Sequence, residues 1–207
     1  MSIKIRKAVE KDIPFLAKMM LQSSRAGKKV GIFDLIFETD DDEKILEDLE
    51  KLSRTKAKNH CRYDNFLVAE SDGKSVGTLC SYEPRIATRQ VFEDALREIG
   101  QDTGVADRLA PLYECDFQLN NRTLMFDFME ELEGFVDVGV LKALMTKSLL
   151  TARLKGYRIA QALVEIGSLE TILFYKTLGF HEVENKRCES YREIFGRDGL
   201  LLLSVEF

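Results

Sequence analysis

The chain has 207 residues, of which 45% are hydrophobic and 31% charged, and its formal net charge is −5. This composition is typical of a soluble globular protein, and its acidic balance offers nucleic acid no basic field to bind. No apolar run approaches the roughly 20 residues of a membrane-spanning helix, so we expect no membrane contact.

The cysteine and histidine content argues against a metal site. The four cysteines are far apart in the chain: Cys61, Cys80, Cys115 and Cys188. No C-x-x-C pair occurs and only two histidines are present, so we expect no zinc site and no other bound metal. Residues 1–6 lack the apolar segment of a signal peptide, so we expect a cytoplasmic protein with reduced thiols rather than a disulfide framework.

The first elements follow from the hydrophobic pattern. Residues 3–8 alternate apolar and charged side chains, which predicts a strand. A helix is expected to start at Glu10, with apolar residues on one face, and to break from Gly27 on. A second helix is expected to begin after Thr39 or Asp40, because either residue is a good N-cap.

The middle of the chain predicts a hairpin, a helical segment and a further strand. Residues 63–70 and 75–82 are strand-like and flank an Asp-Gly dipeptide, which favours a tight β-turn. Residues 85–115 are expected to form a helical insertion. Residues 124–129 predict the next strand.

The last third of the chain begins with a predicted helix over residues 139–155, which Gly156 is expected to end in a left-handed conformation. Four further elements are predicted after it, in the order strand, helix, strand, strand: residues 159–166, 168–179, 180–183 and 200–205. The helix among them is expected to be capped by Ser168.

Together these elements predict an α/β (α+β) fold in a single domain, residues 1–207. The hairpin implies antiparallel pairing, and a helix between two apolar strands, which occurs twice, implies some parallel pairing. We therefore expect a mixed central sheet of about six to seven strands, flanked by helices on both faces.

The segment that ends at Phe180 contains Tyr175, Gly179 and Phe180 in the pattern Tyr-x-x-x-Gly-Phe, and a helix, a Lys-Gly-Tyr turn and an apolar strand precede it. This pattern and this order of elements resemble those of the GNAT acetyltransferase family. The resemblance implies a GNAT-like fold and an N-acetyltransferase that uses acetyl-CoA to acetylate a primary amine. The amine, of a small molecule or a peptide, cannot be identified from the sequence, and the oligomeric state, a homodimer included, stays open.

The resemblance also implies where the cofactor binds. Family members hold the pyrophosphate at a helix start, because unpaired backbone N–H groups and the positive end of the helix dipole attract anions. In the aligned window only Gly139 matches, while Val136, Asp137 and Leu141 depart from the motif, which predicts weaker or rearranged binding. The implied cofactor contacts are Met129, Glu130, Glu131, Val138, Gly139, Val140, Leu141, Ser168 and Tyr175.

Two residues are the candidates for catalysis. Tyr175 matches the family's general acid, and a phenol with a pKa of about 10 keeps its proton at neutral pH until a departing thiolate takes it. Asp127 lies between apolar residues on the predicted strand, where burial would raise its pKa toward that of a general base. Alternation places Asp127 on the same face as Met129. Glu130, Glu131 or a water molecule are the alternatives for the base.

A second hypothesis comes from another class of function. The departures from the cofactor motif also fit a GNAT fold that no longer acetylates and acts as a binding or regulatory module. His60 and Cys61 do not indicate a nucleophilic pair, because adjacent residues of a strand point to opposite faces. The acceptor pocket is expected within residues 22–62 and 84–121.

Overall fold

A computed structural model describes residues 2–101, 104–119, 122–136 and 138–207. Within these residues, seven strands form one sheet. In the order in which they lie side by side, they are β1 (Ile3–Lys7), β2 (Phe66–Ser71), β3 (Lys74–Tyr82), β4 (Thr123–Glu131), β5 (Ile159–Glu165), β7 (Gly199–Glu206) and β6 (His181–Arg187). Strands β4 and β5 pair in parallel and the other neighbours pair antiparallel. The predicted mixed sheet is therefore confirmed.

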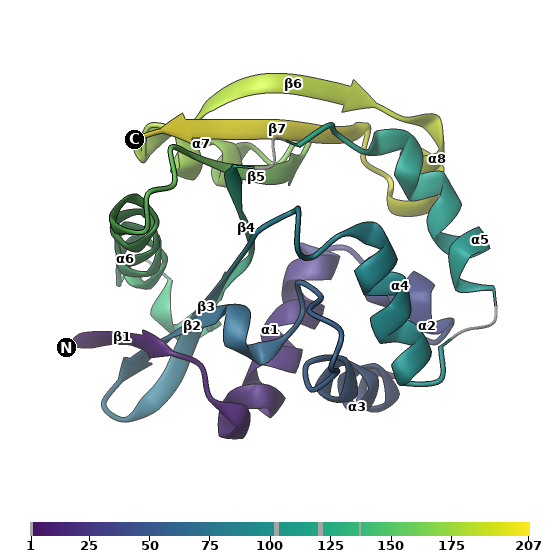
Figure 1. The fold of residues 1–207 in the computed structure, drawn as a ribbon, viewed down its shortest axis with the longest axis horizontal. Coiled ribbons are helices and arrows are strands. Elements are labelled where there is room, and N and C mark those ends of the chain that lie inside the picture. The colour runs from purple at the N-terminus through teal and green to yellow at the C-terminus, as the bar shows by residue number, and fades with distance from the viewer. Residues whose placement is uncertain (1, 102–103, 120–121, 137) are drawn as a thin grey trace.

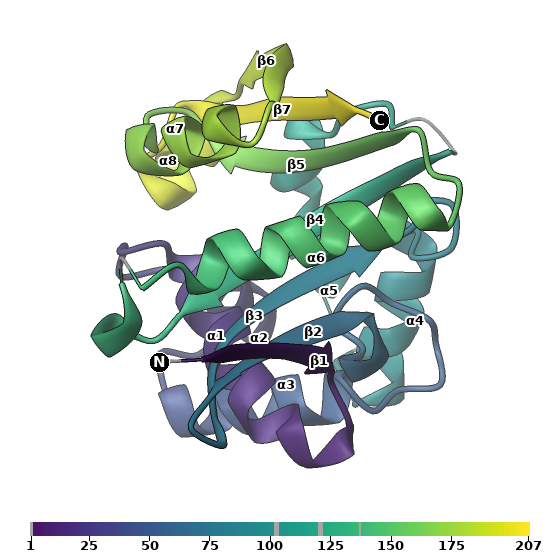
Figure 2. The same ribbon diagram turned by 90° about the vertical axis from the view of Figure 1, so that its left-hand side faces the viewer.

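Helices cover both faces of this sheet, as predicted (Figures 1 and 2). Helices α6 (Val140–Leu154) and α7 (Leu169–Thr177) pack on one face. Those that pack on the other face are α1 (Ile13–Arg25), α2 (Ile32–Phe37), α3 (Asp42–Leu52), α4 (Arg89–Glu98), α5 (Val105–Leu109) and α8 (Glu189–Phe195). Short 3-10 helices are η1 (Glu10–Asp12), η2 (Tyr63–Asn65), η3 (Ala110–Cys115) and η4 (Glu133–Phe135). None of the helices in the described residues combines the length and apolarity that crossing a bilayer requires.

Two hydrophobic cores result from the strand period. Successive side chains of a strand point to opposite faces, so neighbouring residues of the hairpin belong to different cores. Val68 and Cys80 join the core under α1, whereas Ala69 and Leu79 join the core under α6. The sheet is thus buried on both sides, which explains why its central strands are apolar at nearly every position.

The start of α3 differs slightly from the prediction. Asp41, not Thr39 or Asp40, is the N-cap, and its carboxylate accepts hydrogen bonds from the backbone N–H groups of Glu43 and Lys44. Thr39 instead accepts a hydrogen bond from the backbone N–H of Asp41, at 3.2 Å. Asp41 thereby satisfies helix donors that would otherwise lack a partner.

The C-terminal region differs more from the prediction. Helix α8 lies between β6 and β7. The sequence pattern predicted these two strands but no helix between them. Its seven residues are too few to show a helical period clearly. Strand β7 also returns between β5 and β6, so the second expected parallel pair does not form and β7 pairs antiparallel with both neighbours.

A disulfide joins Cys115, the last residue of η3, to Cys188, the N-cap of α8. The prediction of reduced thiols is therefore wrong for these two cysteines, while Cys61 and Cys80 are free and buried. The bonded pair is separated by 73 residues and is brought together by the packing of α8 against η3, which the spacing of cysteines does not indicate. Disulfides are rare in cytosolic proteins, so this bond does not support the predicted cytoplasmic location.

Candidate active site

A deep cleft opens where β4 and β5 stop pairing. The two parallel strands are in register from Thr123 opposite Ile159 to Phe126 opposite Ala162, and beyond that point they separate. Figure 2 shows them close together at one end and apart at the other. The resulting cleft has a volume of about 1050 Å³ and runs from the start of α6 to the loops around α1 and α4. It is large enough for two small substrates to meet in it.

A β-bulge lies in the half of β4 that lines the cleft. Thr78 pairs with Glu130 and Cys80 with Asp127, so β4 has one residue more than β3 in this stretch. The extra residue is accommodated at Phe128, whose φ of +45° is in the left-handed region that non-glycine residues avoid. The Thr78 hydroxyl donates a hydrogen bond to the Phe128 carbonyl at 3.1 Å, which stabilises this conformation. Bulges of this kind redirect side chains beside active sites.

The bulge overturns the predicted alternation along β4. Phe128 packs in the core under α1, with its ring centroid 5.9 Å from that of Phe33 and 6.0 Å from that of Phe66. Met129 packs against the opposite core, the one that contains Phe126. Asp127 and Met129 therefore do not share a face, because the inserted residue reverses the period of two.

The free edge of β4 is the first feature that suits a cofactor. Residues 127–131 pair with β3 on one side but with no described strand on the other. Met129, Glu130 and Glu131, all predicted as cofactor contacts, line the cleft along this edge. The Glu130 carboxylate also accepts a hydrogen bond from Gln22 at 2.8 Å, and burial raises its pKa. An unpaired strand edge offers backbone donors and acceptors to an extended ligand.

The start of α6 is the second such feature. Gly139 is the N-cap, with a φ of +88°, and as a glycine it offers no side-chain cap to the first N–H groups of the helix. Gly139, Leu141 and Lys142 line the cleft. Val140, another predicted cofactor contact, is fully buried and does not line the cleft: it packs against Gly77, where an added Cβ would lie 2.6 Å from its side chain.

Two further predicted cofactor contacts, Val138 and Ser168, and the motif departure Asp137 have different outcomes. Val138 is exposed and does not line the cleft, and Asp137 lies outside the described residues. Ser168 does line the cleft and occupies the N-cap position of α7, but its side chain makes no capping hydrogen bond. The predicted capping role of this serine is therefore wrong, and its hydroxyl is not committed to the helix.

Asp127 lies on the wall of the cleft and is half-buried. Its Oδ1 accepts a hydrogen bond of 2.7 Å from the backbone N–H of Phe128, which favours the ionised form. Burial is the larger influence and raises the pKa of the Asp127 carboxyl to about 6. A carboxyl with this pKa is ionised at neutral pH and is a far stronger base than an exposed aspartate, as general-base catalysis requires.

Tyr175 reaches the same cleft from α7. It is 4% exposed and contacts Phe180 edge-on, with ring centroids 4.9 Å apart. Its hydroxyl makes no hydrogen bond within the described residues. Burial, and then the nearby Asp127 carboxylate, raises the pKa of the Tyr175 phenol. The two residues predicted for catalysis are thus brought together, with the tyrosine protonated and the aspartate ionised at neutral pH.

The far end of the cleft is lined by aromatic rings that the sequence analysis did not assign to a site. The His60 ring contacts those of Phe92, Tyr82 and Phe128, at centroid distances of 4.7, 5.4 and 5.9 Å. Burial lowers the pKa of His60 to about 4, so this imidazole is neutral. His60 lies in a turn rather than a strand, and burial raises the pKa of Cys61, so the two do not form a nucleophilic pair.

An ionic cluster connects the two sides of the cleft. Glu165, at the end of β5, forms an ion pair with Lys28 from the loop after α1 and a second one with Arg197, at 3.4 Å. The Tyr191 hydroxyl donates a further hydrogen bond to Glu165 at 2.9 Å. These residues are scattered in the sequence, so no motif indicated them.

Several solved structures with the same fold are described as acetyltransferases. No family model and no curated protein sequence matches the chain. A structure described as an acetyltransferase has a TM-score of 0.72 at 18% identity and covers 98% of each chain. An N-acetyltransferase from Staphylococcus aureus Mu50 has a TM-score of 0.73 at 17% identity, covering 98% of this chain and 100% of that one.

A third structure carries the family name in its description. It is a GCN5-related N-acetyltransferase from Kribbella flavida, with a TM-score of 0.61 at 16% identity, covering 99% of this chain and 98% of that one. At these identities the likeness establishes the fold. The chain therefore has the GNAT fold, and the predicted resemblance to this family is confirmed at that level.

Proposed function

We propose that the chain is a GNAT-type N-acetyltransferase that transfers an acetyl group from acetyl-CoA to the primary amine of a small molecule or a peptide. The observation that carries the proposal is the content of the cleft between β4 and β5. A half-buried aspartate, a protonated tyrosine, an unpaired strand edge and a helix start with a glycine N-cap all face this one space.

The cleft fits acetyl-CoA through its backbone more than through its side chains. The edge of β4 suits the extended amide-containing arm of the cofactor, and the start of α6 suits its pyrophosphate. Leu141 and Val136 line the cleft in place of the motif residues. Lys142, also in the first turn of α6, supplies a positive charge that partly replaces the missing motif side chain.

Acetyl-CoA, when bound, supplies an activated acetyl thioester. Asp127 accepts the proton that the amine loses as its nitrogen forms a bond to the acetyl carbon. Tyr175 donates the proton that the sulfur gains as the carbon–sulfur bond breaks. The pKa of Asp127, about 6, and the raised pKa of Tyr175 hold the two groups in the protonation states that these steps require.

The lining of the far end favours an amine carried on an apolar group. Phe92, Tyr82 and the neutral His60 form an aromatic wall. Asp127 and Glu130 place carboxylates between this wall and the proposed cofactor site. A cationic amine is attracted by the carboxylates, and its apolar substituent is desolvated against the rings.

Calorimetric titration with acetyl-CoA is the first test. We expect saturable binding with a Kd in the micromolar range, because the backbone features of the site are intact. A spectrophotometric assay for free CoA thiol, run with a panel of primary amines, then tests transfer. Absence of binding at millimolar acetyl-CoA would overturn the proposal.

A second candidate function is a binding or regulatory module without acetyltransferase activity. It is favoured by Val136 and Leu141, which line the cleft where the motif has a long polar and a small residue. The double substitution Val136→Arg and Leu141→Gly is expected to raise CoA affinity if the start of α6 is the site. Leu150→Gly, on the exposed face of the same helix, controls for the loss of helix stability. Tight binding by the double variant without turnover would favour this second candidate.

A further inference from the structure

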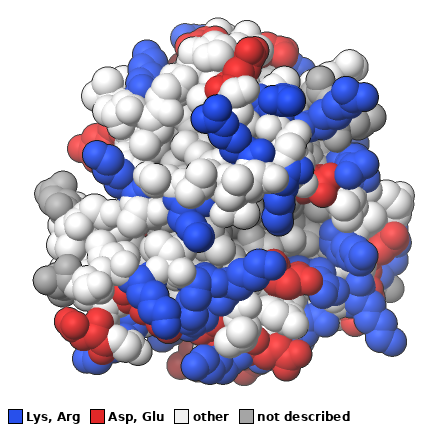
Figure 3. Space-filling view, turned by 60° about the vertical axis from the view of Figure 1, so that its left-hand side comes forward, with Lys and Arg blue, Asp and Glu red and all other residues white. Residues whose placement is uncertain are grey.

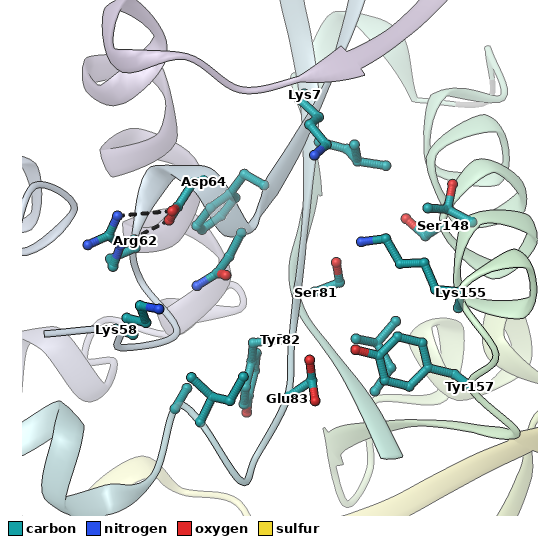
Figure 4. A pocket seen from close by; sticks show the side chains of 18 residues that line it. Lys7, Lys58, Arg62, Asp64, Ser81, Tyr82, Glu83, Ser148, Lys155 and Tyr157 are labelled. Atoms are coloured by element: carbon teal, nitrogen blue, oxygen red, sulfur yellow. Dashed lines mark hydrogen bonds and ion pairs between the residues drawn. The ribbon is translucent and has the colours of Figure 1, made fainter. Parts of the chain in front are cut away.

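A second cavity lies between β3 and the C-terminal half of α6, away from the start of that helix (Figure 4). Its volume is about 300 Å³, at the small end of ligand sites. Lys7 from β1, Ser81 from β3, and Ser148 and Lys155 from α6 and its end line it. The proposed catalytic residues Asp127 and Tyr175 do not.

The positive charges in this cavity are only partly balanced by the protein: the pKa of Glu83 is lowered by hydrogen bonds from Tyr157 and Arg85 and also by the charge of Lys155. Among the described residues, no carboxylate lies within ion-pair distance of Lys7 or Lys155. The two carboxylates that line the cavity already have partners: Asp64 pairs with Arg62 at 2.9 Å and Glu83 with Arg85 at 2.6 Å. The local charge is therefore positive, although the whole chain carries a net charge of −5.

The surface around the cavity is also rich in positive charge. Lys and Arg side chains gather on the face that carries α6 (Figure 3). In Figure 4 the side chains of Lys7 and Lys155 point toward the space beside Ser81. Two ammonium groups that share a small space repel each other, and an anion placed between them converts this repulsion into attraction.

A buried hydroxyl without a partner is the independent observation. Ser148 is 4% exposed and lines the cavity, and its Oγ has no hydrogen-bond partner in the part of the chain that the structure describes. Leaving a buried hydroxyl unsatisfied costs about 1–3 kcal/mol, so such groups call for a ligand or water. The neighbouring Thr151 hydroxyl, in contrast, donates to the Lys147 carbonyl at 2.7 Å.

We propose that this cavity is a binding site for a phosphate group, either inorganic phosphate or the phosphoryl end of a small phosphate ester. Lys7 and Lys155 supply the charge, and the hydroxyls of Ser81 and Ser148 donate hydrogen bonds to the phosphate oxygens. The anion sits toward Lys7, because Glu83, which accepts a hydrogen bond from Tyr157, occupies the other end. This site is separate from the proposed acetyl-CoA site and does not depend on acetyltransferase activity.

Calorimetric titration of the full chain with sodium phosphate tests the site, with ionic strength held constant by sodium chloride. We expect saturable binding with a Kd of about 1 mM or tighter. Lys7→Gln and Lys155→Gln should each weaken it about tenfold or more, because each removes one of the lysine charges that line the cavity, which also include Lys58. Lys147→Gln is the matched control: it is an exposed lysine of the same helix that does not line the cavity, and it should change nothing.

A parallel titration with glycerol 3-phosphate distinguishes the two sources of the phosphate group. Tighter binding of the ester than of phosphate supports a phosphate-ester site, and the reverse supports a site for the free ion. Absence of saturable binding below about 10 mM would overturn the proposal. Equal loss of affinity in Lys147→Gln and in the two cavity variants would overturn it as well, because the effect would then reflect only the net charge of the face.

Discussion

The two halves of β4 differ in a way that explains where the chemistry is concentrated. Residues 123–126 are buried and pair with β5, and Met125 and Phe126 also pair with β3, as in an ordinary central strand. Residues 127–131 are paired on one side only and contain the left-handed Phe128. The comparison teaches that one strand can stabilise the sheet with its first half and leave its second half free to bind and react.

The largest expected effect is on the aspartate that begins the second half. Asp127→Asn should lower kcat/KM about 10³-fold at pH 7.5, because the proton acceptor is lost while the shape of the side chain is kept. Turnover is measured by release of CoA thiol, and acetyl-CoA affinity should not change. Asp72→Asn, in the exposed hairpin turn, is the control. Full activity of Asp127→Asn would exclude Asp127 as the general base and would show that the second half of β4 does not supply it.

The next effect is on the tyrosine that faces this half of the strand from α7. Tyr175→Phe should lower kcat about 10²-fold while leaving KM for acetyl-CoA nearly unchanged, because only the proton of the phenol is lost. Steady-state kinetics with a productive amine measure both constants. Tyr63→Phe, a tyrosine outside the cleft, should behave as the wild type. An unchanged kcat in Tyr175→Phe would remove this residue from the acid role.

A third prediction concerns stability and pH. The pKa of Asp127 is raised in the folded chain to about 6, so its carboxyl stabilises the fold at low pH and loses that contribution as pH rises from about 4 through 6. The Asp127→Asn variant has no carboxyl to ionise, so its stability does not fall in this way as pH rises. It should be more stable than the wild type by about 1–3 kcal/mol at pH 7, with little difference at pH 4. Urea unfolding at both pH values measures the difference. A gain of stability that is the same at pH 4 and pH 7 would contradict the assigned pKa.

The smallest effect compares one phenylalanine from each half. In a regular strand, a Gly variant is less stable than the Ala variant at the same position by about 0.5–1 kcal/mol. We expect this order for Phe126→Gly and Phe126→Ala. At Phe128 the order should reverse, because a non-glycine residue in the left-handed region costs about 1–2 kcal/mol that Gly avoids. The free energies of unfolding of the Ala and Gly variants at each position, measured in urea, give the two differences. The same sign at both positions would show that Phe128 carries no backbone strain.

The fold was largely predictable because it depends on local patterns that repeat over many residues. Apolar periodicity located the long helix α6, the hairpin of β2 and β3, and the central strands β4 and β5. Short elements were less predictable: α8 has too few residues to show a period, and the disulfide between Cys115 and Cys188 has no spacing signal.

The candidate site was predictable only in part. Asp127 and Tyr175 were indicated by their sequence neighbours and by the family motif, and the fold brings both into one cleft. The bulge at Phe128 was not predicted, since it depends on how β4 pairs with β3 rather than on a local pattern. The aromatic wall around His60 and the basic cavity at Lys155 were missed for a related reason, because their residues come from segments far apart in the chain.

The sequence by itself determined the mixed sheet, the helices on its two faces and the chemical types available for catalysis, because hydrophobic period and side-chain chemistry are local properties. The tertiary structure alone decided where β4 leaves β5, which face each residue after the bulge takes, and which distant side chains share a cavity. These features depend on pairing between segments whose positions are settled only when the whole chain packs.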